Sequence, residues 1–198
     1  MTQAERAAAS DRAMIDAAIE LILERGTDGT TLAAIGERAG YSRGLATYRY
    51  GSKSGLFQEV SNTIQRRWVG YLKAAVEGKT AIDALCAAAG AYFKFVTAAP
   101  ADIRVLHILL YEGAAPNSDL RGLAKQAFAR QITDAEAWLR NGIETGTVRE
   151  DISPRDVAAQ YVAHIAGVTY MWLLNPIEID FAAIHENYTR TLRERLAA

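Results

Sequence analysis

An all-α fold is the first expectation from this sequence of 198 residues. Alanine, leucine and ionic residues, which have high helix propensities, dominate the composition, and the only four prolines are spread along the chain. Apolar residues also recur every three or four positions over much of the sequence, which is the spacing of one face of an α-helix. Because 50% of the residues are apolar, a chain of this length can bury a sizeable core.

Two helices are expected in the first part of the chain. The first covers residues 10–25, where apolar side chains recur at helical spacing, and Gly26 is placed to end it. The second covers about residues 32–39, after a cap from the hydroxyl of Thr30 or Thr31.

A third short helix follows almost at once. Only Gly40, Tyr41 and Ser42 separate it from the second helix, and Ser42 is placed to cap it. It runs to about residue 49, before a glycine–serine pair interrupts the chain. Two short helices joined by a three-residue turn that contains glycine form the helix-turn-helix pattern.

The remaining sequence predicts six more helices, about nine in all. Thr80 and Asp83 fit a capping box, and Pro100 ends the helix that they open. Ser153 followed by Pro154 is a typical helix start, and the helix that begins there is apolar around nearly its whole circumference, so it must be buried on both sides. The six helices are expected at about residues 53–76, 81–99, 103–111, 120–145, 154–174 and 177–196.

Positive charge is concentrated in one segment, although 22 basic and 23 acidic residues nearly cancel over the whole chain. Residues 38–73 hold seven basic side chains and one acidic one, whereas residues 1–37 hold three and seven, and residues 74–198 hold twelve and fifteen. Such a cluster is the electrostatic footprint expected of a protein that binds a polyanion. A solvated basic helix face is the alternative that charge alone leaves open.

The third helix carries side chains suited to the DNA major groove. A recognition helix needs outward-facing groups that are small or that form hydrogen bonds with base edges. Arg43 and Arg49 match the two acceptors of guanine. Thr47 or Leu45 matches the methyl group of thymine, and Gly44 would let the helix backbone approach closely.

Lys53 stands where a cation is unfavourable unless an anion is bound. In the first turn of a helix it opposes the helix dipole, at a cost of about 0.3–1 kcal/mol. With a DNA phosphate bound there, the charge of Lys53 would be stabilising. Lys53, the backbone N–H groups behind Ser52 and the hydroxyl of Tyr48 would hold that phosphate. An exposed lysine that tolerates the small cost is the alternative.

The segment TTLAAIGERAGYSRGLATYRYGSKSGLF, residues 30–57, resembles the helix-turn-helix of TetR-family transcriptional repressors. The resemblance implies a three-helix DNA-binding domain in residues 1–53 and a larger helical domain for ligand binding and dimerisation in residues 54–198. It implies that the protein is a DNA-binding regulator whose partner is double-stranded DNA. The implied DNA-binding residues are Thr31, Tyr41, Ser42, Arg43, Gly44, Leu45, Thr47, Tyr48, Arg49 and Lys53.

Two departures from the family pattern affect the detailed contacts. Thr47 stands where the family often has tyrosine, and Arg49 and Tyr50 stand where it often has histidine and phenylalanine. Tyr50 is still expected to pack beneath the third helix.

The resemblance also implies a homodimer, a palindromic operator and a small-molecule effector. The last two long helices would form the dimer, and the two recognition helices would reach half-sites about 34 Å apart, or a multiple of this. Coverage of these apolar helices by the rest of the same chain is the alternative. The candidate dimer residues are Tyr161, Ile165, Val168, Trp172, Ile184, Tyr188 and Leu192.

Aromatic side chains of the middle helices are candidates to line an effector pocket. Aromatic rings with occasional polar tips suit a mainly apolar, weakly charged effector. For each of them a place in the core is the alternative, and His107 in its apolar run fits a hydrogen-bonded core histidine. The candidates are Trp68, Tyr71, Tyr92, Phe95, His107, Tyr111, Trp138 and Trp172.

An enzyme and a protein-interaction module are the competing classes. The three histidines show no metal-ligand spacing, no nucleophile elbow occurs and Cys86 has no nearby histidine, so no catalytic residue, metal site or cofactor is expected. A helical interaction or scaffold module without DNA binding would explain the apolar last helices. It would not explain the cluster of basic residues.

A cytoplasmic location is expected. One cysteine excludes an internal disulfide framework. The first 18 residues lack the apolar run of a signal peptide, and no stretch reaches the roughly 18 uninterrupted apolar residues of a membrane span, so no membrane partner is expected.

Overall fold

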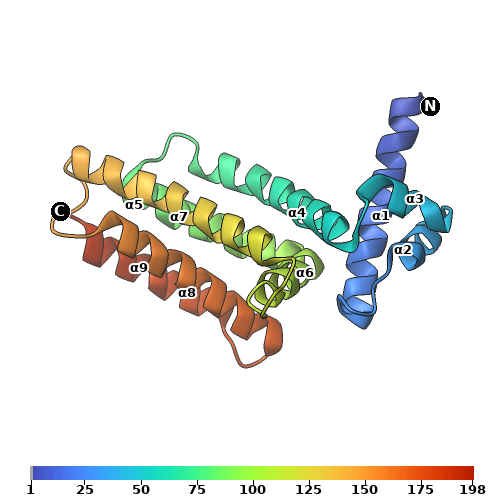
Figure 1. Ribbon diagram of the computed structural model, residues 1–198. Coiled ribbons are helices and arrows are strands. Elements are labelled where there is room, and N and C mark those ends of the chain that lie inside the picture. Colours follow the sequence, from blue (N-terminus) through green and yellow to red (C-terminus); the bar gives the residue numbers. More distant parts are fainter. Residues whose placement is uncertain (1) are drawn as a thin grey trace. The chain divides into compact units, whose positions relative to one another are not determined.

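The computed structural model describes residues 2–198, and this part of the chain is all-helical, with one isolated bridge between Val148 and Ala197 in place of any longer strand (Figure 1). The predicted all-α fold class is confirmed, with nine helices in residues 2–198. They are α1 (Gln3–Arg25), α2 (Leu32–Arg38), α3 (Arg43–Tyr50), α4 (Lys53–Val76), α5 (Ala81–Ala98), α6 (Pro100–Glu112), α7 (Arg121–Glu144), α8 (Pro154–Leu174) and α9 (Phe181–Leu196).

The helices form two compact units. The first unit contains residues up to 66 and residues 101–124, so it holds α1, α2, α3, the start of α4 and nearly all of α6. The second unit contains residues 67–100 and 125–198, with the end of α4, α5, most of α7, α8 and α9. This grouping describes packing, and the functional boundary expected after residue 53 stays a prediction.

In the first unit, α1 packs against α2 and α2 packs against α3. Met14 of α1 and Ile35 of α2 are fully buried in its core. Arg38 of α2 donates hydrogen bonds to both carboxylate oxygens of Glu24 at 2.8 Å and to Glu20 at 3.1 Å, both on α1. The hydrogen bond from Arg38 holds the pKa of Glu24 below its usual range. Arg38, one of the seven basic side chains of residues 38–73, therefore joins α2 to α1.

The helix caps are partly as predicted. α1 begins well before the predicted residue 10, because the hydroxyl of Thr2 accepts from the Glu5 N–H at 3.2 Å while the Glu5 carboxylate accepts from the Thr2 N–H at 2.7 Å. Thr31, one of the two candidates, caps α2 at 3.2 Å. Ser153 caps α8, which confirms the predicted start of that helix.

Two other predicted capping interactions are wrong, although the bounds of α3 and α5 are close to those predicted. Thr80 and Ser42 occupy the N-cap positions of α5 and α3, but neither side chain accepts a capping hydrogen bond. Asp83, expected to complete a capping box, instead accepts a hydrogen bond from Arg193 of α9 at 2.6 Å. Pro100 follows the end of α5 as predicted, and it is also the first residue of α6. At that position a helix needs no backbone N–H.

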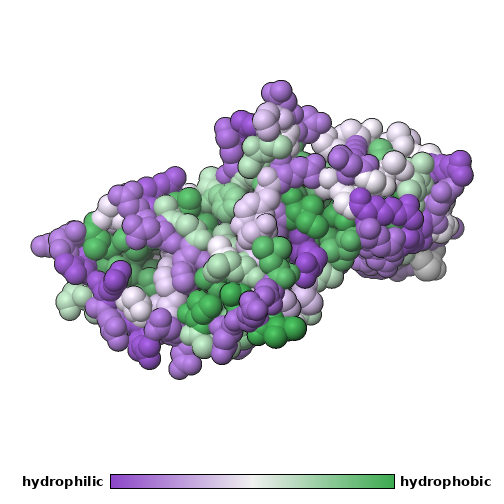
Figure 2. All heavy atoms as spheres, turned by 90° about the horizontal axis from the view of Figure 1, so that it is seen from below, coloured by the Kyte–Doolittle hydropathy of each residue, from purple (hydrophilic) through white to green (hydrophobic). Residues whose placement is uncertain are grey.

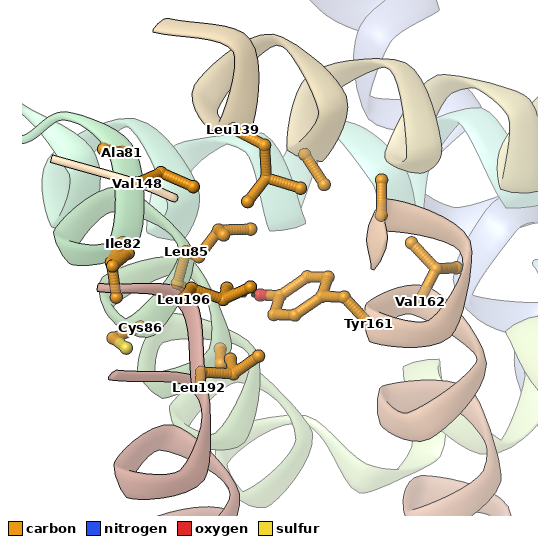
Figure 3. Close-up of a cluster of buried hydrophobic side chains, with 13 residues drawn as sticks. Ala81, Ile82, Leu85, Cys86, Leu139, Val148, Tyr161, Val162, Leu192 and Leu196 are labelled. Atoms are coloured by element: carbon orange, nitrogen blue, oxygen red, sulfur yellow. Dashed lines mark hydrogen bonds between the residues drawn. The ribbon is translucent and has the colours of Figure 1, made fainter. Parts of the chain in front are cut away.

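The core of the second unit is a cluster of buried apolar side chains contributed mainly by α5, α7, α8 and α9 (Figure 3). Leu85 and Leu139 expose no surface. Tyr161 extends its ring from α8 into the cluster, and its hydroxyl donates to the backbone carbonyl of Leu85 at 3.0 Å (Figure 3). Burial raises the pKa of this hydroxyl well above its usual value. The bundle is therefore held by apolar packing with a satisfied polar group inside it.

Within residues 2–198, α5 and α8 are long enough and apolar enough to resemble membrane-spanning helices, with mean hydropathies of 1.3 and 1.2 over 18 residues. The α5 window is 50% buried inside the structure, which is typical of a core helix. The α8 window is only 33% buried, so the rest of the chain does not cover α8 on both sides, which was the alternative to a partner surface. A large part of this apolar helix remains exposed.

Candidate nucleic-acid interface and effector cavity

The turn between α2 and α3 depends on two glycines. Gly40 has a φ of +79°, a backbone conformation that residues other than glycine rarely adopt, as the turn pattern predicts. A Cβ atom on Gly36 would lie 2.6 Å from the backbone oxygen of Ser42, so α2 and the start of α3 approach too closely for a larger residue. The Tyr41 N–H also donates to the Gly36 carbonyl at 2.8 Å. Gly36 was not singled out from the sequence, although a glycine inside a short helix is a signal of close approach.

Most of α3 faces away from the protein interior. Ala46 is its only buried residue, and Tyr48 is 88% exposed. A Cβ on Gly44 would meet no atom within 4 Å, so the packing of the chain does not require glycine there. Leu45 and Lys53 are half-buried. The predicted residues that are exposed are Thr31, Tyr41, Ser42, Arg43, Gly44, Thr47 and Tyr48.

The two arginines of α3 have different surroundings. The Arg43 side chain is 77% exposed and forms an ion pair with the exposed Glu37 of α2. The Arg49 side chain is 26% exposed and turns toward α1, where it donates to Asp11 at 2.6 Å and to the Ser10 hydroxyl at 3.1 Å. The structure thus brings Arg43, but not Arg49, onto the open face with Thr47. Neither acidic partner was identified from the sequence, because both pairings depend on how α1, α2 and α3 pack.

Tyr50 packs at the inner end of α3. The side chain is half-buried and its hydroxyl oxygen is fully buried. Burial raises the pKa of Tyr50 to about 12, and the negative charge of Asp11 adds to that rise. The predicted place of this ring beneath α3 fits the structure.

Lys53 opens α4 beside the end of α3. The Ser52 hydroxyl accepts a hydrogen bond from the Gly55 N–H at 3.0 Å, so part of the free helix start is already satisfied. The Lys53 ammonium lies 5.7 Å from the centroid of the Phe57 ring, within the range of a cation–π attraction. Lys53 therefore lies at the N-terminus of α4, where the sequence predicts a phosphate contact.

A cavity of about 50 Å³ lies within the second unit. Three of the eight predicted pocket residues, Trp68, Tyr92 and Trp138, line it. The Trp68 and Tyr92 rings meet edge to face with centroids 5.3 Å apart. The remaining lining residues, which were not expected, are Leu72, Ala88, Gln131, Asp134, Ala135, Tyr161, Val162 and Ile165.

The other five predicted pocket residues do not line this cavity. Phe95 is buried and packs against Tyr71 at a centroid distance of 5.2 Å, and Trp172 stacks on Phe181 at 5.6 Å. His107 and Tyr111 belong to the first unit. His107 is buried, and its Nδ1 lies 3.0 Å from the carbonyl oxygen of Ile103, as expected of a hydrogen-bonded core histidine.

The predicted dimer residues fall into two groups. Tyr161, Val168 and Leu192 are buried within the second unit, which leaves little of their side chains for a partner. The half-buried group is Ile165, Trp172, Ile184 and Tyr188.

Apolar side chains are nevertheless exposed near the end of α8. Ile177, after α8, is 94% exposed. Figure 2 shows the molecule from below relative to the view of Figure 1, and apolar patches lie among the hydrophilic side chains on this face. The exposed large apolar residues of this region are Tyr170, Met171, Leu174 and Ile177.

Comparison with known proteins gives concordant matches. Residues 14–60 match the family model described as bacterial regulatory proteins, tetR family. The chain is 23% identical over 190 residues to the HTH-type transcriptional regulator AcrR of Shigella flexneri, an alignment that covers 91% of this chain and 86% of AcrR.

Two solved structures share the fold over nearly the whole chain. A complex of SmeT with triclosan has a TM-score of 0.81 at 21% identity and covers 96% of this chain and 92% of SmeT, the repressor of the SmeDEF multidrug efflux pump of Stenotrophomonas maltophilia. FadR of Bacillus subtilis in complex with stearoyl-CoA has a TM-score of 0.77 at 20% identity and covers 91% of this chain and 96% of FadR. At these identities the likeness establishes the fold.

Proposed function

Because the chain belongs to the TetR family of bacterial regulatory proteins, we propose that it represses transcription by binding a palindromic DNA operator as a homodimer. A small effector would release it from the operator. The observation that carries this proposal is the outward face of α3, where Arg43, Thr47 and Tyr48 are exposed after a turn in which Gly36 closely approaches the Ser42 backbone.

The proposed DNA contacts follow from the exposure of each side chain. Arg43 exchanges its exposed ion pair with Glu37 for the acceptors of a guanine, and Thr47 contacts a thymine methyl group. The open space around Gly44 supports a close approach of the α3 backbone to the groove. Lys53 and Tyr48 contact phosphates, and these contacts position the helix without reading sequence. Thr31, Tyr41, Ser42 and Leu45 complete the proposed interface, in a DNA-binding part that comprises residues 1–53.

The proposed dimer uses the half-buried residues of α8 and α9. An apolar helix face that its own chain leaves exposed is stabilised by a second copy. Ile165, Trp172, Ile184 and Tyr188 are the residues we assign to it, within a ligand-binding and dimerisation part that comprises residues 54–198. A two-fold axis would give the operator its palindromic symmetry, with half-sites about 34 Å apart or a multiple of this.

We place the effector in the cavity lined by Trp68, Tyr92 and Trp138. SmeT binds triclosan and FadR binds stearoyl-CoA, which supports a mainly apolar effector for a chain of the same fold. Because the cavity measures about 50 Å³, it holds only part of a drug-sized molecule and its walls must move when one binds. Such a movement could favour the state with lower DNA affinity, which is all that coupling requires.

The other candidate functions are less well supported. The family consists of transcriptional regulators and is not a class of enzymes. A protein-interaction module would leave the exposed cationic and hydroxyl side chains of α3 without a role. A DNA-binding regulator works where the chromosome is, so we propose a cytoplasmic location.

Titration of the full chain into a fluorescent duplex tests DNA binding. The duplex would be selected by the protein from a random-sequence pool, and anisotropy would be read at several salt concentrations. We expect tight binding that weakens steeply as salt rises, because phosphate contacts release counterions. Failure to enrich any duplex, with no binding to random DNA at low salt, would falsify the proposed function.

Thermal unfolding with triclosan and with stearoyl-CoA tests the effector site. A ligand that binds only the folded chain raises the unfolding temperature with concentration, and it should also lower the affinity for the selected duplex. Trp138→Leu should reduce the rise, whereas Tyr71→Leu is the control, because Tyr71 does not line the cavity. Equal reductions in both variants would contradict the assignment of the cavity.

A further inference from the structure

Arg49 is bound to α1 by two hydrogen bonds. Its Nη1 donates to Asp11 Oδ1 at 2.6 Å, and its Nη2 donates to Ser10 Oγ at 3.1 Å. The partners are 38 and 39 residues away in the sequence, so these contacts join the C-terminal end of α3 to α1. Hydrogen bonds between charged groups are the stronger ones, and this pair is partly shielded from water.

The groups around Arg49 are arranged to accept these hydrogen bonds. Ser10 is buried and its hydroxyl donates to the Ala7 carbonyl at 2.9 Å, which leaves its oxygen lone pairs for Arg49. The buried hydroxyl of Tyr50 lies under the influence of the same Asp11 carboxylate. If Arg49 turned outward to reach DNA, the partly buried Asp11 carboxylate would lose its ion-pair partner. Leaving this charge unpaired costs free energy.

Arg43, on the same helix, has the opposite properties. Its ion pair with Glu37 is exposed on both sides, at 77% and 50% of the two side chains. Exposed ion pairs contribute little to stability, so Arg43 is free to exchange Glu37 for a DNA group. One arginine of α3 is therefore available to a ligand, whereas the other is committed to the fold.

We propose that Arg49 is a positioning residue: its ion pair with Asp11 fixes the end of α3 against α1 and so sets the angle at which α3 enters the major groove. Arg49 contacts neither a base nor a phosphate. This inference rests on the proposed function, because it assumes that α3 reads DNA. It replaces the expectation from sequence that Arg49 reaches guanine.

The direction in which Asp11→Asn changes DNA affinity distinguishes a positioning role of Arg49 from a direct contact of Arg49 with DNA. Asp11→Asn removes a negative charge from the DNA-binding unit, and by charge alone this should tighten binding to a polyanion. If Asp11 instead holds α3 through Arg49, the same change weakens binding. A direct phosphate contact by Arg49 would also make the salt dependence of binding shallower by about one unit when Arg49 is removed.

The experiment measures the dissociation constant of the full-length chain for the selected duplex over a series of salt concentrations. The variants are Asp11→Asn, Arg49→Gln and the double variant, each corrected for its folded fraction by thermal unfolding. We expect each single variant to bind about threefold to tenfold more weakly, with the salt dependence of the wild type. The double variant should bind no more weakly than either single variant, because both remove the same contact.

Two further variants serve as matched controls. Arg43→Gln, on the same helix, should reduce the salt dependence or relax the base preference. Asp28→Asn, in the turn after α1, measures the effect of removing one exposed acid from the same unit. Unchanged or tighter binding of Asp11→Asn overturns the inference, and so does a loss of salt dependence in Arg49→Gln. If the wild-type chain binds no duplex at all, the proposed function fails first, and the two failures are distinguishable.

Discussion

The α3 segment of the first unit and the α8–α9 region of the second unit differ in how their side chains are used. On α3 only Ala46 is buried, and the side chains of Arg43, Thr47 and Tyr48 are exposed. On α8, Tyr161, Val168 and Leu173 are buried, and the exposed side chains near its end are largely apolar. The first segment keeps Arg43, Thr47 and Tyr48 exposed to a ligand at little cost in packing. The second contributes to stability and still leaves apolar surface uncovered.

The largest effect that would test this comparison is expected in the core of the second unit. Leu139→Ala should lower the free energy of unfolding by about 2–5 kcal/mol, because Leu139 exposes no surface and its loss leaves a cavity. Urea denaturation followed by circular dichroism measures this. Thr47→Ala is the contrasting change on α3 and should alter stability by less than about 0.5 kcal/mol. Similar losses in both variants would contradict the division of roles.

A glycine pair in the first unit sharpens the comparison. Gly36→Ala should destabilise the α2–α3 turn by about 1–3 kcal/mol and reduce DNA binding, because its Cβ would lie 2.6 Å from the Ser42 carbonyl oxygen. Gly44→Ala meets no atom within 4 Å, and alanine favours a helix by up to about 1 kcal/mol, so this variant should be as stable as the wild type or more so.

Weaker DNA binding by a stable Gly44→Ala variant would indicate that the DNA backbone or a base approaches α3 at that position. Unchanged affinity would show that no close approach occurs there. Thermal unfolding and anisotropy on the same samples give both quantities.

The side chains proposed to contact bases and those proposed to contact phosphates should differ in their effect on DNA binding. Arg43→Ala should cost about 1–3 kcal/mol of binding free energy on the preferred sequence and relax the preference at one base pair. Lys53→Ala and Tyr48→Phe should weaken binding to all sequences alike, since phosphate contacts carry no base information. Competition between the selected duplex and single-base variants of it measures this, and equal affinities for all three variants and the wild type would contradict the assignment.

The smallest effect is a pH dependence in the second unit. Burial lowers the pKa of His164 and His185, whose rings stack on Tyr188 and Phe93 at centroid distances of 3.6 and 5.6 Å. The unfolded chain therefore binds these protons more readily. The stability that the neutral rings contribute is complete above the ordinary histidine pKa of about 6.5 and is lost as the pH falls below it.

Thermal midpoints measured between pH 7.5 and pH 5 test this dependence. Phenylalanine at both positions keeps the stacked rings but does not titrate, so the double variant His164→Phe, His185→Phe should show a flatter profile. The carboxyl groups of Glu24, Glu136 and Asp151 have lowered pKa values, and their stabilising effect is lost at lower pH. An unchanged slope in the double variant would assign the dependence to other groups.

Features that depend on neighbouring residues were predictable from the sequence. The turn at Gly40, the cap of Ser153 on α8 and the concentration of cations around α3 follow from local backbone chemistry and spacing. Thr80 and Asp83 show how such a pattern fails, because Asp83 pairs with Arg193, 110 residues away, and no capping bond forms. The predicted pocket residues were only partly right for the same reason, because sequence spacing does not report long-range packing. Trp138 lines the cavity, whereas Trp172 packs on Phe181.

The sequence by itself determined the helices, the helix-turn-helix and its cationic segment, because helical periodicity, glycine turns and charge are properties of nearby residues. Only the tertiary structure decided which arginine of α3 is free, since Asp11 and Glu37 select between Arg49 and Arg43 through the packing of three helices. It also decided which apolar residues of α8 and α9 are buried and which remain exposed. Burial is a property of the assembled bundle, and periodicity specifies a helix face without specifying what covers it.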